Sequence, residues 1–176
     1  MESGLLLLRV VLGGIMAVHG AQKLFGWFGG LGLAGTGGWL ESMSLRPARL
    51  HAAVVALAEF GGGALLVLGL ITPLGAAAVA GVMFVAIATV HWSNGFFNAG
   101  GGYEFNLLIL ASAIALVFTG PGKISIDHLA GWTLAGPAWG FVVFGISAAA
   151  ATSVLAMRKP QPAQTKEESR EELIAA

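Results

Sequence analysis

Several ionisable side chains lie inside stretches of the sequence that are otherwise apolar. Arg9, His19 and Lys23 interrupt the first apolar stretch, and Glu59 lies in the middle of another, residues 50–71. If these stretches cross a bilayer, each charge costs at least roughly 2.5–3.5 kcal/mol, so it must face a bundle interior and usually serves function. A carboxylate near a lysine or histidine at that depth could form an ion pair, relay protons or anchor a ligand.

Helical spacing places several of these groups on one face. Residues at i, i+4, i+7, i+11 and i+14 share a face of a helix. Counted from residue 9, these positions hold Arg9, Gly13, Met16, Gly20 and Lys23, with His19 on the flank. A rise of about 1.5 Å per residue separates the two ends of this stripe by about 21 Å. We therefore expect Arg9 and Lys23 near opposite faces of a membrane.

The composition decides the class of protein. Of 176 residues, 56% are hydrophobic and only 10% are charged, and the mean hydropathy is +0.82. Soluble proteins have about 45–50% apolar and about 25% charged residues. Eight of the eighteen charged residues lie between Arg158 and Glu172, which leaves too few for a charged surface elsewhere. We expect an all-α, multi-span membrane protein in contact with the lipid bilayer.

Other kinds of site and partner lack support. The absence of cysteine excludes disulfides, Fe–S clusters with cysteine ligands and zinc–thiolate sites. A net charge of zero without a basic stripe gives no sign of nucleic-acid binding. No His pair is spaced i, i+4, no flavin motif is evident, and a haem would need His19 and His91 to meet across helices. We therefore expect no metal and no cofactor bound through a motif of the chain itself.

A span needs about 20 mainly apolar residues. The sequence offers five candidate spans, at 5–25, 50–71, 74–90, 103–118 and 138–157. Residues 26–49 contain too much glycine to span, and 36–43 could form a short helix at the interface. These segments predict a four-helix transmembrane bundle with a fifth, C-terminal transmembrane helix.

This topology sorts the polar residues into two groups. One half of the bundle receives the candidate cluster, to which Glu59 reaches from mid-depth, and His51 and Asn106 fall in the same half. The opposite face receives a second candidate group that could pair. The cluster comprises His19, Lys23, Glu59, His91, Asn94 and Glu104, and the opposite group comprises Arg9, Lys123 and Asp127.

Each candidate also has a structural explanation. Arg9 and Lys23 could extend their charged ends to the interface along an apolar stem. His91 could cap the third span or bind a loop carbonyl, and His51 lies at a span boundary. Glu59 could make a structural hydrogen bond to a neighbouring helix.

Lysine and arginine counts orient the chain. With five spans, seven basic residues share the side of the first loop and the C-terminus, against two on the other side. This predicts an N-terminus outside the cell membrane and a cytoplasmic C-terminus. If 138–157 did not span, the count would be six against three, with both termini cytoplasmic. The seven are Lys23, Arg46, Arg49, Arg158, Lys159, Lys166 and Arg170; the two are Arg9 and Lys123.

Five ordered motifs resemble the DoxX family of small bacterial membrane proteins. The first is Arg9-x-x-x-Gly13-x-x-x-x-x-His19-Gly20-x-x-Lys23-Leu24, and the second is Glu59-Phe60-Gly61-Gly62-Gly63-Ala64-Leu65. The others are His91-Trp92-Ser93-Asn94-Gly95-Phe96-Phe97, Gly102-Tyr103-Glu104-Phe105-Asn106-Leu107 and Gly120-Pro121-Gly122-Lys123-Ile124-Ser125-Ile126-Asp127. The resemblance implies a four-helix membrane domain and an association with quinol oxidase, thiosulfate:quinone oxidoreductase or redox-defence assemblies.

The chain departs from that family pattern after the fourth span. We predict a DoxX-like domain over residues 1–128, a connector and fifth helix over 129–157, and a charged, disordered cytoplasmic tail over 158–176.

Three functions follow from these patterns. The first is a non-catalytic subunit or scaffold of a membrane redox or oxidative-stress complex, with a soluble redox partner on the cytoplasmic side or a second copy of the chain. The second is a quinone- or lipid-binding oxidoreductase subunit that uses the His/Lys/Glu cluster. The third is a small transporter or channel, which the gathering of polar groups in one half disfavours. Without an electron-carrying motif, the first is favoured over an enzyme.

Overall fold

The computed structural model describes residues 1–158 and is built from helices, with no strand in that part of the chain. The predicted tail, 158–176, therefore lies almost wholly outside the described residues. The long helices are α1 (Glu2–Phe25), α3 (Ala48–Leu68), α4 (Thr72–Ala86), α5 (Glu104–Thr119) and α7 (Pro137–Ala156). The short ones are η1 (Trp27–Gly29), α2 (Gly32–Ser42), the π-helical η2 (Ile87–His91), η3 (Trp92–Asn94), η4 (Asn98–Gly100) and α6 (Ile126–Leu129).

Four helices are long and apolar enough to cross a membrane. They are Glu2–Phe25, Ala48–Leu68, Thr72–Asn94, in which η2 and η3 extend α4, and Pro137–Ala156. The helix at Glu104–Thr119 is equally apolar but has 16 residues. The expected multi-span bundle with an additional C-terminal helix is confirmed.

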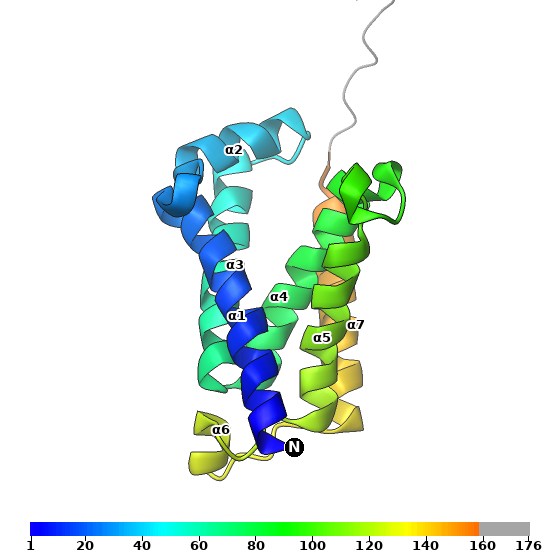
Figure 1. Ribbon diagram of the computed structural model, residues 1–176. Helices are drawn as coiled ribbons and strands as arrows, with labels where there is room; N and C mark the ends of the chain where they lie inside the picture. The colour runs from blue at the N-terminus through cyan, green and yellow to red at the C-terminus, as the bar shows by residue number, and fades with distance from the viewer. Residues whose placement is uncertain (159–176) are drawn as a thin grey trace, which may run out of the picture.

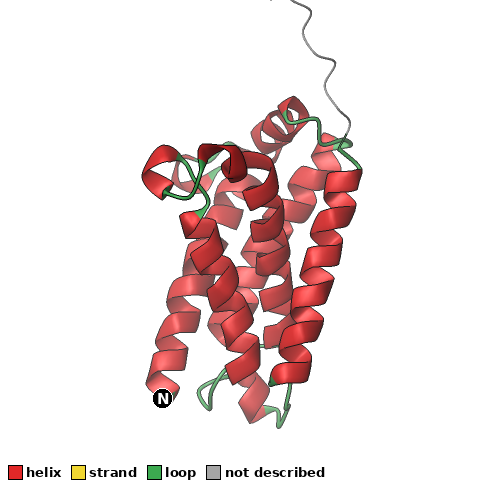
Figure 2. Ribbon diagram, turned by 90° about the vertical axis from the view of Figure 1, so that its right-hand side faces the viewer, coloured by secondary structure: helices red, strands yellow, loops and turns green. Residues whose placement is uncertain are grey.

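The long helices alternate in direction along the bundle (Figure 1). The N-terminus and α6 lie at one end, here called the α6 end, and α2 lies across the other, here called the α2 end. A view turned by 90° shows the same long helices side by side (Figure 2). At the α2 end, Arg158 Nε donates to the carbonyl oxygen of Met43, 2.9 Å away, so the end of α7 is joined to the linker after α2.

Glycines let α1 and α3 pack backbone to backbone. A Cβ atom at Gly13 would lie 2.5 Å from the carbonyl oxygen of Gly63, and one at Gly20 would lie 2.2 Å from the backbone nitrogen of Phe60. Such distances leave no room for a side chain. Close approach of small residues is a common basis of helix association in membranes, where the hydrophobic effect does not drive it.

We expect Gly20→Ala to destabilise the protein and Gly14→Ala to leave it intact. The methyl group at residue 20 would meet backbone of α3, whereas a Cβ at Gly14 has no atom within 4 Å. Overpacking typically costs about 1–3 kcal/mol. Thermal unfolding in detergent measures both variants, and equal melting temperatures would show that the α1–α3 contact is not rigid.

The turn between α3 and α4 lies at residues 69–71, earlier than the break at 72–73 between the predicted spans 50–71 and 74–90. Gly69 and Ile71 have positive φ angles of 61° and 43°, and α4 already begins at Thr72. Pro73 lies in the first turn of α4, where its missing N–H has no intrahelical partner in any case. Here the proline starts a helix rather than ending one.

The opposite-face residues gather at the α6 end as expected. Arg9 is 1% exposed, so it does not reach for the interface as one alternative held. Its guanidinium donates to the carbonyl oxygens of Pro121 at 2.5 Å, Ile124 at 2.8 Å and Val67 at 3.3 Å. Arg9 therefore joins α1 to α3 and to the segment before α6.

Asp127 and Lys123 form their hydrogen bonds with groups other than Arg9. The Asp127 carboxylate accepts hydrogen bonds from the backbone of Ile71 and Thr72, at 2.6 and 2.9 Å, and from Thr72 Oγ1 at 2.7 Å. The backbone N–H of Lys123 donates to the carboxylate of Glu2. None of the ion pairs found within residues 1–158 joins two of the three predicted residues, so the predicted mutual pairing is not seen.

Candidate functional site

A cavity of about 460 Å³ lies in the half of the bundle near the α2 end. One wall comes from α1, α2 and α3, and the facing wall from α4, η2, α5 and α7. Its lining is mostly apolar, with few polar groups. Sites for small molecules are typically cavities of roughly 300–1,000 Å³ with this character. The polar residues of the lining are His19, Lys23, His51, Glu59, Thr89, His91, Asn98 and Asn106.

An ion pair between Lys23 and Glu59 forms the charged part of the lining. Lys23 Nζ lies 2.5 Å from Glu59 Oε2, and the two side chains are 22% and 5% exposed. Lys23 comes from the last turn of α1 and Glu59 from the middle of α3. Because the glycine contacts hold these antiparallel helices close, residues 36 positions apart meet. The ion pair is one of the three roles that the sequence suggested for a carboxylate at this depth.

Three histidines line the same cavity with different surroundings. His19, on α1, is an exposed residue even though it lines the cavity. His91 Nδ1 donates to the carbonyl oxygen of Gly101 at 2.7 Å, and a bond to a loop carbonyl was one of the structural alternatives for this residue. His51 Nε2 is buried and has no hydrogen-bond partner within the described residues.

Asn94 and Glu104 lie at the same end of the bundle but do not line the cavity. The Asn94 side chain donates to the carbonyl oxygen of Gly101 at 3.2 Å, and the Glu104 carboxylate accepts from the backbone nitrogen of Asn98 at 3.0 Å. Both side chains therefore stabilise the loop between η2 and α5 by hydrogen bonds to its backbone, and they are here called the loop-bracing pair. The predicted cluster thus divides into a cavity group (His19, Lys23, Glu59, His91) and the loop-bracing pair.

Four polar residues of the cavity lining were absent from the predicted cluster: His51, Thr89, Asn98 and Asn106. His51 was assigned to a span boundary and Asn106 was only placed in the same half, yet both line the cavity. The available signal for Asn106 was an amide in the apolar helix Glu104–Thr119, where a buried polar group needs a partner. For His51, position near a helix start gave no indication of the direction of its ring.

The amino-terminal half of the chain, residues 4–92, matches the profile of the DoxX family. The chain belongs to the DoxX family. A protein of Bacillus subtilis (strain 168) named "Putative oxidoreductase CatD" is 35% identical over 126 residues, which cover 72% of this chain and 86% of that protein. No solved structure matches the chain.

The DoxX match covers most of the cavity. Residues 4–92 include α1 to η2, and with them Lys23, Glu59 and the three cavity histidines. Asn106 on α5 and the part of the wall from α7 lie beyond it. The DoxX family and the four long apolar helices together identify a multi-pass membrane protein.

Proposed function

We propose that this DoxX-family protein is the quinone-binding membrane subunit of a redox complex, in which a partner protein carries the electrons. The observation that carries the proposal is the Lys23–Glu59 ion pair in the lining of a mostly apolar cavity. An apolar body with a few polar oxygens is the chemistry that such a cavity selects. The oxidoreductase name of the relative from Bacillus subtilis supports a redox setting.

The residues of the cavity suit a quinone ring. Lysine and histidine donate hydrogen bonds to carbonyl oxygens, and the apolar lining suits the ring and the start of an isoprenoid chain. The quinone supplies the two-electron, two-proton chemistry. Lys23 would orient the ring through one oxygen, and Glu59 would exchange a proton at its carboxylate. Since the chain contains no cysteine and no haem or flavin motif, we assign the electron donor to the partner.

The partner would bind at the α2 end, and we place that end in the cytoplasm. The basic residues of this end are Lys23 in the last turn of α1, Arg46 and Arg49 between α2 and the first turn of α3, and Arg158 after α7. The α6 end has Arg9 and Lys123. The positive-inside rule then sets the N-terminus outside the cell membrane. Truncation after Met157 should weaken co-purification of a cytoplasmic partner while the protein stays in the membrane. Unchanged co-purification would contradict a contact through the charged C-terminal segment.

Native mass spectrometry of the protein gently extracted from its own membrane tests the proposal directly. We expect a stoichiometric isoprenoid quinone, identified by lipid extraction and its absorption spectrum. A soluble protein that co-purifies with no small ligand would instead favour the scaffold function. Ordinary phospholipid alone would contradict a quinone site.

Filling the cavity should displace the ligand. A Cβ at Gly81 has no atom within 4 Å and the residue lines the cavity, so Gly81→Phe places a ring inside it. We expect quinone binding to weaken at least about tenfold, because the ring and the quinone need the same space. The matched control is Gly145→Phe, on the exposed side of α7 with equally open surroundings. Equal binding by the two variants, measured by equilibrium titration, would place the quinone elsewhere.

A further inference from the structure

Asn106 is a buried amide whose hydrogen-bonding capacity is poorly used. It lies on α5 among apolar neighbours and is 9% exposed. Its Nδ2 atom contacts the sulfur of Met83 at 3.5 Å, the one hydrogen bond found for this side chain within residues 1–158. A thioether is a weak acceptor. A buried amide without a good partner destabilises a protein, so its presence here calls for an explanation.

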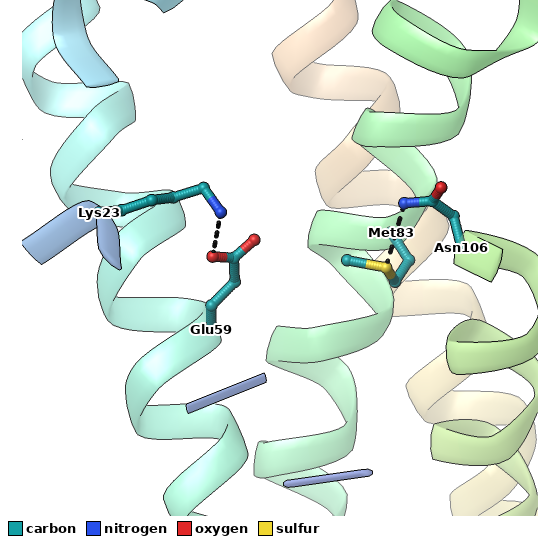
Figure 3. A network of polar contacts seen from close by, with 4 residues as sticks. All are labelled: Lys23, Glu59, Met83 and Asn106. Carbon is teal, nitrogen blue, oxygen red and sulfur yellow. Dashed lines mark hydrogen bonds and ion pairs between the residues drawn. The ribbon is translucent and has the colours of Figure 1, made fainter. Parts of the chain in front are cut away.

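The position of Asn106 in the cavity suggests an explanation for this poorly partnered amide. Its side chain and that of Met83 lie on α5 and α4, and Lys23 and Glu59 lie on α1 and α3 across the cavity (Figure 3). The two polar pairs face one another at a similar depth in the bundle (Figure 3). Met83 and Ile109 line the cavity beside Asn106, so the amide is set in an apolar part of the lining.

We propose that Asn106 is the second polar contact of the ligand and makes the site selective for rings with oxygens at opposite ends. This inference rests on the proposed quinone-binding function. Lys23 Nζ would bind one oxygen and Asn106 Nδ2 the other, with the ring between apolar side chains. The class of ligand is then a 1,4-quinone or its quinol, and a ring with a single oxygen would satisfy only one of the two contacts.

The variant Asn106→Leu separates this role from a structural one. If Asn106 serves the ligand, replacing a poorly satisfied amide by an apolar side chain of similar size should raise the melting temperature of the ligand-free protein. If Asn106 instead holds α4 and α5 together, the melting temperature should fall. Ala111→Leu, on the exposed side of α5, controls for the added leucine.

Binding is measured by titrating the full-length protein in detergent with decyl-1,4-benzoquinone and with decylphenol, which has one ring oxygen. We expect the wild type to prefer the quinone, and Asn106→Leu to bind it about tenfold more weakly while binding the phenol unchanged. Asn106→Ala should lose the same preference, and it keeps the test valid if the leucine variant does not fold.

The outcomes distinguish the two levels of the proposal. A variant that melts at a lower temperature and keeps the preference for quinone would overturn the role of Asn106 alone. A wild type that binds neither compound would overturn the proposed function and this inference together. Loss of the preference with a melting temperature at or above that of the wild type supports both.

Discussion

Lys23→Met is expected to destabilise the protein far more than Glu59→Gln, and the double variant is expected to recover most of the loss. The Glu59 side chain is 5% exposed and the Lys23 side chain 22% exposed. Removing the lysine leaves a buried carboxylate without a counter-charge, which costs about 3–5 kcal/mol. Removing the carboxylate leaves an ammonium on a flexible stem near the end of α1, which can move toward the interface.

The double variant removes both charges and therefore the cause of the destabilisation. Buried ion pairs often contribute little net stability, since the charges lose their hydration. Thermal unfolding of the four proteins in detergent gives the coupling between the two residues. If both single variants were as stable as the wild type, the ion pair would have no energetic importance.

The effects of these variants on turnover are expected to rank differently from their effects on stability. Glu59→Gln should stay folded but lose quinone-dependent turnover in the assembled complex, because an amide cannot exchange the proton that a carboxylate can. The stable double variant should be equally inactive. Full turnover in Glu59→Gln would eliminate Glu59 as the proton-exchanging group without touching its structural pairing with Lys23.

The second large effect is expected at the α6 end. Asp127 is 1% exposed, and its carboxylate accepts three hydrogen bonds at the start of α4. Asp127→Ala leaves three donors unpaired, two of them on the buried Thr72, at roughly 1–3 kcal/mol for each buried group. We expect a loss of about 3 kcal/mol, which is a large part of the 5–15 kcal/mol typical of folded proteins.

Two further variants test the cause of that loss. Asp127→Asn keeps one acceptor oxygen and should recover part of the stability. Lys123→Ala removes an exposed side chain near the same turn and should have little effect, since the bond to Glu2 uses the backbone of residue 123. Equal losses for Asp127→Asn and Asp127→Ala would indicate that the negative charge matters more than the acceptor geometry.

Hydropathy and helical periodicity were enough to predict the long helices. The stripe from Arg9 to Lys23 is buried along most of its length, and Gly13, Met16 and Gly20 pack as its spacing suggests. The end of the bundle at which each polar residue lies could also be predicted, because successive spans alternate in direction. These features depend on short-range spacing and on the direction of each helix, which a sequence displays directly.

Other features depend on contacts that spacing does not encode. Asn94 and Glu104 were grouped with Lys23, but the turns at Gly95 and Gly101, which have positive φ angles, direct them to the backbone of their own loop. The role of Asp127 required the segment after α5 to fold back beneath the start of α4. The cavity arises between two walls of helices, and no single segment of sequence specifies such a space.

The bond from Arg158 to the carbonyl of Met43 gives the end of α7 a mechanical connection to the cavity. Met43 and Val154 both line it, so the last turn of α7 and the linker after α2 form one rim. A binding partner that displaced Arg158 from Met43 would change this rim. Any resulting change in ligand affinity would be matched by a change of the same factor in the affinity for that partner.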